Sequence, residues 1–250
     1  MLNKAALALG WMLALSPAAT LHAAELQVLA GGSITAVLGE LGPQFERASG
    51  HKLVIQYAGT PELIKRATSG APFDLGVVPS EVMKDAAARV QFAPGPMTDV
   101  ARVGYGVAVR AGAPKPDVST PDALRQALLQ AQSVALVPES AAGAVVLLMF
   151  ERLGISEAMR AKIRPAAAPA QIAPAVARGE AELGVFLVNV LTAPGVELAG
   201  PFPPELQQEL VFTAAIAADT READAAKAFI ALLTSPAGVA VIRAKGMSPG

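Results

Sequence analysis

The stretch LQVLAGGSITAVLGELGPQFERA, residues 26–48, decides the predicted fold. Leu26 to Ala30 form a short apolar run that predicts a buried strand. Gly31-Gly32-Ser33 predicts a tight turn, and from Ile34 to Ala48 the apolar side chains recur at helical spacing. A strand, a turn and a helix in this order are typical of an α/β fold with largely parallel strands.

Two further strand–turn–helix units follow. Residues 53–58 predict a second strand, followed by the turn Gly59-Thr60-Pro61 and a helix over 62–69. Residues 73–78 predict a third strand, which ends at Pro79-Ser80 before a helix from Glu81. Three helix N-termini therefore gather at one edge of a sheet, the edge at which open α/β sheets bind ligands.

A second α/β unit lies between two long predicted strands, residues 103–110 (VGYGVAVR) and 210–218 (LVFTAAIAA). Inside it, strands are expected at 134–137 and 184–188, and the turn PESAAG at 138–143 precedes a helix. The stretch 194–204 is rich in proline and is expected to be irregular.

This order of elements predicts a two-lobed α/β fold in which two doubly wound sheets are joined by two hinge strands. Residues 25–106 would form the first part of lobe 1 and residues 107–209 would form lobe 2. Residues 210–250 would return to lobe 1.

Composition excludes several classes of function. The chain has 250 residues, 53% of them hydrophobic, and a formal net charge of −1, so no basic surface favours nucleic acid. It has no cysteine, which removes disulfides and thiolate sites. Of its two histidines, His22 lies in the predicted signal peptide, so His51 alone would remain and a multi-histidine metal site is excluded. The dinucleotide, P-loop, zinc-protease and nucleophile-elbow motifs are absent from the sequence, so no metal and no cofactor is predicted.

Residues 1–24 predict a secretory signal peptide. Lys4 gives a positive start, Ala5 to Leu15 form an apolar segment, and small residues end at Ala23-Ala24. The apolar segment is shorter than the roughly 20 residues that cross a bilayer, so cleavage and release are expected rather than anchoring. The mature protein is therefore expected in the periplasm.

Several motifs together resemble the molybdate-binding periplasmic proteins of ABC importers. These motifs are AGGSIT at 30–35, YAGT at 57–60, GAPFDL at 70–75, PESAAG at 138–143 and GEAELG at 179–184. The resemblance covers nearly the whole mature chain and implies a type II periplasmic binding protein fold. It also implies a monomer that delivers a small anion to an inner-membrane ABC permease. In that family, hydroxyls and backbone N–H groups at helix N-termini hold the anion without a formal positive charge.

The resemblance implies a set of binding residues in this chain. Ser33 and Thr60 match the two hydroxyl-bearing turns, although each could instead cap a helix without any ligand. The remaining implied contacts are Gly32, Gly59, Pro79, Ser140 and Ala141.

Three positions depart from the family pattern. Leu187 stands where molybdate binders have a tyrosine, Val190 where an aspartate is common, and Gly59 where a serine is usual. Asn189 is the polar neighbour that could substitute. We therefore expect weaker oxyanion binding or a larger organic anion.

The segment VGYGVAVRAGAPKPDVS, residues 103–119, also resembles a branch of molybdate-binding-like proteins that includes aconitate isomerases. Membership of that branch implies proton transfer on a small tricarboxylate, which needs a cationic clamp and a general base. The candidates for these roles are Arg110, Lys65, Arg66 and Glu139. A receptor without turnover and a cofactor-free isomerase thus both remain open.

For three further polar residues the sequence pattern favours a structural role. Tyr57 and Tyr105 could hydrogen-bond a ligand, but packing in the core or hinge is the preferred interpretation. Asp74 lies between apolar neighbours at the start of a strand, which favours a structural hydrogen bond over catalysis.

Overall fold

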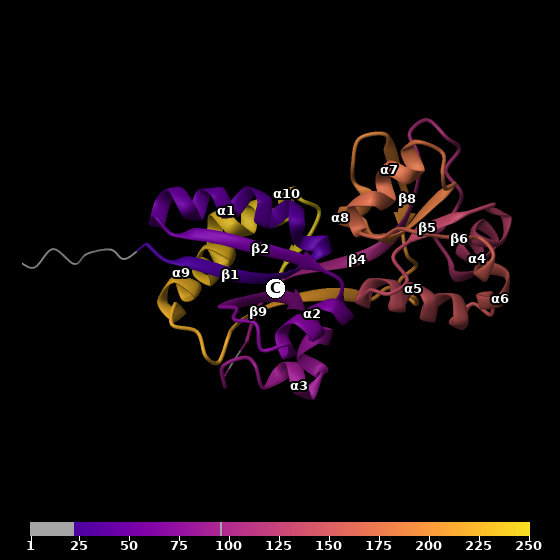
Figure 1. Cartoon of the computed structure of the whole chain (residues 1–250). Helices are drawn as coiled ribbons and strands as arrows, with labels where there is room; N and C mark the ends of the chain where they lie inside the picture. The colour runs from indigo at the N-terminus through magenta and orange to yellow at the C-terminus, as the bar shows by residue number, and fades with distance from the viewer. Residues whose placement is uncertain (1–22, 96) are drawn as a thin grey trace, which may run out of the picture.

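The computed structural model describes residues 23–95 and 97–250. Residues 1–22, most of the predicted signal peptide, lie outside that range. Figure 1 shows two groups of elements: the beginning and end of the chain form one, and its middle forms the other. We call them the first and second lobes. The predicted α/β class is confirmed.

The strands are β1 (Glu25–Gly31), β2 (Lys52–Ala58), β3 (Leu75–Pro79), β4 (Thr98–Arg110), β5 (Val134–Leu136), β6 (Ile163–Pro165), β7 (Leu183–Leu187), β8 (Val196–Pro201), β9 (Glu209–Ile216) and β10 (Ser248–Pro249). The α-helices are α1 (Thr35–Ser49), α2 (Thr60–Thr68), α3 (Ala86–Arg89), α4 (Pro121–Gln130), α5 (Ala141–Arg152), α6 (Ser156–Arg160), α7 (Ile172–Ala177), α8 (Val188–Leu191), α9 (Ala223–Thr234) and α10 (Pro236–Ala244). The 3₁₀ helices are η1 (Gly32–Ile34), η2 (Ser80–Lys84) and η3 (Pro169–Gln171).

Strand β4 connects the two lobes. The sheet order is β2-β1-β3-β9-β4-β7-β5-β6, in which β1 pairs parallel with β2 and β3, and β5 pairs parallel with β6 and β7. Residues 98–104 of β4 pair with β9, whereas residues 105–109 pair with β7. The predicted boundary between residues 106 and 107 lies inside β4, and the one between 209 and 210 lies at the start of β9.

The second connection between the lobes is the segment between β8 and β9, because β9 pairs only with β3 and β4. Gln207 fastens this segment to β4. Its Oε1 accepts a hydrogen bond from Tyr105 N at 2.8 Å, and its Nε2 donates to Tyr105 O at 3.0 Å. β4 thus spans both lobes as one strand, while the return crossing is irregular.

Successive side chains of β1 point to opposite faces of the sheet and pack into two separate cores of the first lobe. Val28 and Ala30 face the large core that holds the apolar stripe of α1, whereas Leu29 faces a smaller core with α2 and α3. In Figure 1, α1 and α10 lie on one side of this sheet and α2 and α3 on the other. Period-two strands covered by helices on both faces define the α/β architecture.

The structure contains short elements that were not predicted, including β6, and it differs from the predicted elements most clearly at two places. The predicted helix from Glu81 is the short 3₁₀ turn η2, followed by α3, which Asp85 caps by accepting from Ala88 N. The proline-rich stretch contains β8, which pairs with β4 alone and ends at Pro201. Proline is tolerated there because an edge strand leaves one side of its backbone unpaired.

No single helix within the described residues is long and apolar enough to cross a membrane. By length and composition, only α9 and α10 taken together pass that test, with a bend of 60° between them.

Candidate ligand-binding site

A small cavity of about 30 Å³ lies where turns of the two lobes meet. The predicted binding residues that line it are Gly32, Ser33, Gly59, Thr60, Pro79, Ser140 and Ala141. They follow the carboxyl ends of β1, β2, β3 and β5, the edge at which α/β sheets bind ligands.

The first wall of the cavity is the turn between β1 and α1. A Cβ atom on Gly32 would lie 3.2 Å from Pro169 Cδ, so glycine lets the backbone of η1 approach η3 of the second lobe. Ser33 lies inside η1, and its side chain caps no helix, because α1 begins without a side-chain cap. The Ser33 carbonyl accepts a hydrogen bond of 2.8 Å from Asn189 Nδ2.

The second wall is the start of α2. Thr60 is the first residue of this helix, and Gly59 precedes it without a side-chain cap. Thr60 Oγ1 accepts a hydrogen bond of 3.2 Å from the backbone N–H of Ala141, the first residue of α5. A predicted hydroxyl of one lobe is therefore bonded to a predicted backbone donor of the other.

The third wall is the turn before α5. Ser140 caps the helix: its Oγ accepts from Gly143 N at 2.9 Å and donates to Val137 O at 2.8 Å. A Cβ atom on Gly143 would overlap the carbonyl oxygen of Val137, so only glycine fits there. These contacts hold the N–H groups of the first turn of α5 toward the first lobe.

The cavity suits an anion electrostatically. Among the residues that the structure describes, no charged side chain lines it, and the N-termini of η1, α2 and α5 meet at it. Exposed N–H groups and the helix dipole supply partial positive charge at such a point. One water molecule needs about 10–15 Å³ of cavity, so the space as it stands admits a small ion and is too small for a tricarboxylate.

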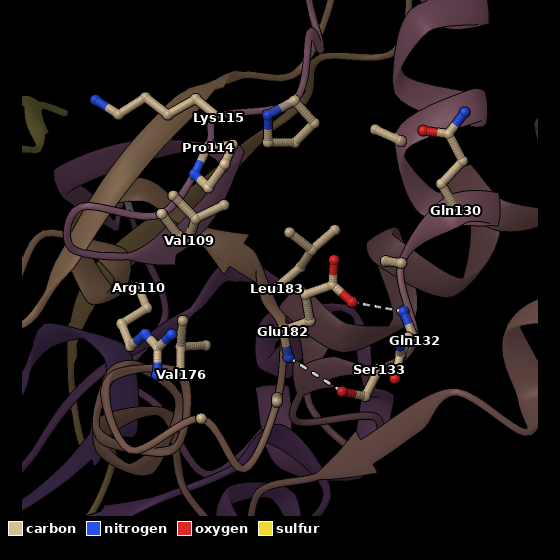
Figure 2. Close-up of a pocket in the computed structure, with 16 residues that line it drawn as sticks. Val109, Arg110, Pro114, Lys115, Gln130, Gln132, Ser133, Val176, Glu182 and Leu183 are labelled. Atoms are coloured by element: carbon tan, nitrogen blue, oxygen red, sulfur yellow. Dashed lines mark hydrogen bonds between the residues drawn. The ribbon is translucent and has the colours of Figure 1, made fainter.

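Two predicted residues do not line this cavity. Leu187 is fully buried and is the cross-strand neighbour of Tyr105. Arg110 is exposed and lines a different cavity of about 500 Å³ with Lys115 and Glu182 (Figure 2). The structure thus corrects the prediction for Arg110. Because β4 runs antiparallel to β7, its end lies at the amino edge of the second-lobe sheet, away from the cleft.

The other candidates for the cationic clamp and the general base lie outside this small cavity. Lys65 and Glu139 line an open cavity of about 650 Å³ that adjoins the first one at Gly59. Glu62 accepts from Arg66 Nε at 3.0 Å and lies 3.7 Å from Lys65 Nζ. The hydrogen bond from Arg66 lowers the pKa of the Glu62 carboxyl, with Lys65 adding to the effect. Both cations therefore already have a partner.

Some lining residues were missed from the sequence. Leu210 and Phe212 alternate along β9 and form an apolar wall, which a period-two analysis of that strand could have placed on one face. Pro169 approaches Gly32 only because the lobes meet, and no local pattern predicts that contact.

Two other polar residues have structural roles. Asp74 accepts hydrogen bonds from Gln27 N at 2.8 Å and Thr220 Oγ1 at 2.6 Å, as the sequence favoured. His51 Nδ1 accepts from Ala24 N at 3.0 Å, and its ring stacks on Phe45 with centroids 5.8 Å apart.

Comparisons with known proteins agree with this architecture. An aconitate isomerase from Pseudomonas sp. is 32% identical over 231 residues, covering 90% of this chain and 87% of that protein. The molybdate-binding protein ModA of Azotobacter vinelandii is 27% identical, covering 90% of each chain. The solved structure of the periplasmic molybdate-binding protein of Azotobacter vinelandii superimposes with a TM-score of 0.73 at 22% identity, covering 89% of this chain and 98% of that one.

The family model for bacterial extracellular solute-binding proteins matches residues 26–248. This range contains all the elements that line the cavity between the lobes. The chain therefore belongs to the bacterial extracellular solute-binding protein family.

Proposed function

We propose that this protein is a periplasmic receptor that captures a small anion between its lobes and delivers it to an ABC permease. One observation carries the proposal: three helix N-termini and the hydroxyl residues Ser33, Thr60 and Ser140 meet at a cavity without a charged lining residue. Such a site pairs the oxygens of an anion with hydrogen-bond donors, and it selects by shape and donor count.

Closure around β4 would complete the site. Thr60 bonds Ala141 and Asn189 bonds Ser33, so two hydrogen bonds already connect the lobes beside the cavity. A ligand that touches both walls binds the closed form better than the open form and shifts the equilibrium between them.

The location follows from the predicted signal peptide. Ala24 is tied into the fold, since its N–H donates to His51 Nδ1 at 3.0 Å and its carbonyl accepts from Lys52 N at 2.8 Å. Cleavage after Ala23 would keep both bonds, whereas cleavage after Ala24 would remove them. We therefore propose cleavage after Ala23. The predicted signal peptide supports a periplasmic location, and the resemblance to periplasmic binding proteins supports a monomer.

A second candidate function is an isomerase of a small tricarboxylate. The 32% identity to an aconitate isomerase favours it. Against it, Arg110 lies at the far edge of the second lobe, and Lys65 and Arg66 are paired with Glu62. An isomerase would need a more open cleft, so that a substrate held between the lobes could also reach Lys65 and Glu139 in the neighbouring open cavity.

A thermal-shift panel tests both functions. The mature protein is mixed with molybdate, tungstate, sulfate, phosphate, citrate and both aconitates. A ligand that binds only the folded state raises the unfolding midpoint. We expect one or more anions to raise it and Ser33→Ala/Thr60→Ala to abolish the rise. The matched control is Thr68→Ala/Ser69→Ala, which alters exposed hydroxyls at the other end of α2.

The outcomes separate the two functions. If no anion raises the midpoint, or if the double variant responds like the wild type, the proposed site is wrong. If proton NMR shows that the protein interconverts cis- and trans-aconitate, the isomerase replaces the receptor.

A further inference from the structure

Tyr105 lies on β4 at the point where the strand changes its partner from β9 to β7. On β4 and β9, Val103 pairs with Leu210 and Ala101 with Phe212. Cross-strand partners share a face, as do alternate residues of one strand. Tyr105 therefore lies on the face that carries Leu210 and Phe212, which line the cavity. The residue is fully buried, and its hydroxyl has no hydrogen-bond partner.

Glu81 approaches the same place from the first lobe. It lies in η2, two residues after Pro79 of the cavity wall. Its Oε2 atom is buried without a hydrogen-bond partner, while its Oε1 lies 3.6 Å from Lys84 Nζ. Burial, together with the negative charge of Glu81, raises the pKa of Tyr105 far above the ordinary value of a phenol. The hydroxyl therefore stays protonated and can donate a hydrogen bond. Pro79 pairs with Phe212 of β9, and Val103 pairs with Leu210 of the same strand, so Glu81 and Tyr105 both lie toward the Leu210 end of β9.

These atoms form an unusual set. Within residues 23–95 and 97–250, the buried side-chain atoms without a hydrogen-bond partner are Tyr105 OH, Glu81 Oε2 and Asn189 Oδ1. Asn189 also touches the cavity wall, since its Nδ2 donates to Ser33 O. The Tyr105 hydroxyl can donate a hydrogen bond, whereas the other two atoms, a carboxylate oxygen and an amide oxygen, only accept. A bound group that satisfies all three atoms must therefore accept a hydrogen bond through an oxygen and also donate one through a hydrogen.

We propose that Tyr105 and Glu81 form a polar subsite beside the cavity that receives a hydrogen-bearing oxygen of the bound anion. Tyr105 O–H donates to that oxygen, and Glu81 Oε2 accepts its hydrogen. This inference rests on the proposed function and narrows the ligand to anions that keep an O–H group. A fully deprotonated oxyanion would leave Glu81 unpaired and would be repelled by it.

Two matched pairs of anions test the subsite by calorimetry on the mature protein. Phosphate near neutral pH keeps a proton that sulfate lacks, and the two share a tetrahedral shape. Citrate carries a hydroxyl that propane-1,2,3-tricarboxylate lacks, and this second pair tests the more open cleft that a tricarboxylate would need. We expect the O–H-bearing member of at least one pair to bind tenfold or more tightly than its analogue, because a site built for a hydroxyl rejects the analogue without it.

Two variants test whether the preference for the O–H-bearing anion depends on Tyr105 and Glu81. Tyr105→Phe removes only the hydroxyl, and Glu81→Gln keeps the size of the side chain but replaces an acceptor oxygen by an NH₂ group. Each is expected to reduce the preference at least tenfold. Tyr57→Phe changes the other tyrosine of the sequence, and Glu205→Gln changes an exposed glutamate; both should keep the wild-type preference. Circular dichroism checks that each variant is folded.

The failures can be told apart. Equal binding within each pair overturns the subsite and leaves the receptor intact. A preference for the O–H-bearing anion that survives both variants also overturns the subsite. That result is expected if a water molecule, and not the anion, occupies the space beside Tyr105 and Glu81. Failure of every anion to bind overturns the proposed function and, with it, this inference.

Discussion

At the scale of single residues, Gly143 decides whether the turn before α5 can form. Its missing Cβ leaves room for the Val137 carbonyl, and the same turn carries Ser140 and Ala141 into the cavity. Gly143→Ala is expected to lower the free energy of unfolding by about 2–4 kcal/mol, since backbone must move, and to weaken anion binding. Urea unfolding and calorimetry measure the two effects.

The matched control is Gly39, which lies in α1 with nothing within 4 Å of a Cβ atom. Alanine has the higher helix propensity, so Gly39→Ala should raise the free energy of unfolding by about 0.5–1 kcal/mol. If Gly143→Ala were as stable as the wild type, the turn could adapt, and our account of this wall would be wrong.

Thr60 joins the lobes through a single hydroxyl. Thr60→Val removes the acceptor of the Ala141 N–H while keeping the branched shape of the side chain. Losing about 1 kcal/mol of hydrogen bonding in the closed form should weaken anion binding about fivefold. Calorimetry with the anion found in the thermal-shift panel measures this change.

Thr68→Val is the control for that experiment, because the Thr68 hydroxyl bonds only the carbonyls of its own helix. Its affinity should equal that of the wild type. An unchanged affinity in Thr60→Val would mean that the bond to Ala141 plays no part in closure.

At the scale of elements, the sequence predicted those strands whose burial leaves a local pattern. Apolar runs mark the strands β1, β3 and β7, because helices cover both faces of the sheet. In α1 the buried apolar side chains recur at helical spacing. β8 was missed because prolines flank it and its only partner is β4, a contact made by tertiary folding. β6 was missed because three residues are too few for a period.

The same distinction applies to the site. That Ser33, Thr60 and Ser140 line the cavity could be predicted, because each follows a strand at one edge of a sheet. The location of Arg110 could not, because it depends on the antiparallel direction of β4, which its residues do not encode locally. Nor could the link between Thr60 and Ala141, which are far apart in the chain and meet only when the lobes do.

The C-terminal helices close the first lobe over α1. Phe229 of α9 is fully buried, and its ring centroid lies 5.0 Å from that of Phe45. Phe229→Ala is expected to lower the free energy of unfolding by about 3–5 kcal/mol, because it leaves a cavity between α9 and α1. Val90→Ala, at a side chain that is 68% exposed, should change it by less than about 0.5 kcal/mol. Equal urea midpoints for the two variants would contradict this packing.

At the scale of the whole molecule, β4 is the strand that belongs to both lobes, so changes in its packing should alter both the stability of the chain and the closure of the lobes. One half of the strand lies in the sheet of the first lobe and the other half in that of the second. Tyr105 lies at the change of partner, where Gln207 also holds the return segment. A side chain buried at this point packs against both lobes. Its ionisation should therefore change the free energy of unfolding of the whole chain.

This expectation gives a pH dependence with a definite sign. Burial raises the pKa of Tyr57, and burial with the charge of Glu81 raises that of Tyr105 further above the ordinary value of 10.0. Below pH 10 both phenols are protonated in the folded and unfolded states, and their contribution is fully present. Above it the unfolded chain loses protons first, so the free energy of unfolding should fall by up to about 1.4 kcal/mol per pH unit for Tyr105 and by less for the half-buried Tyr57. Urea unfolding from pH 9 to 11 should show this fall, reduced most in Tyr105→Phe and less in Tyr57→Phe; an identical slope in Tyr105→Phe would show that the phenol is solvated and not buried between the lobes.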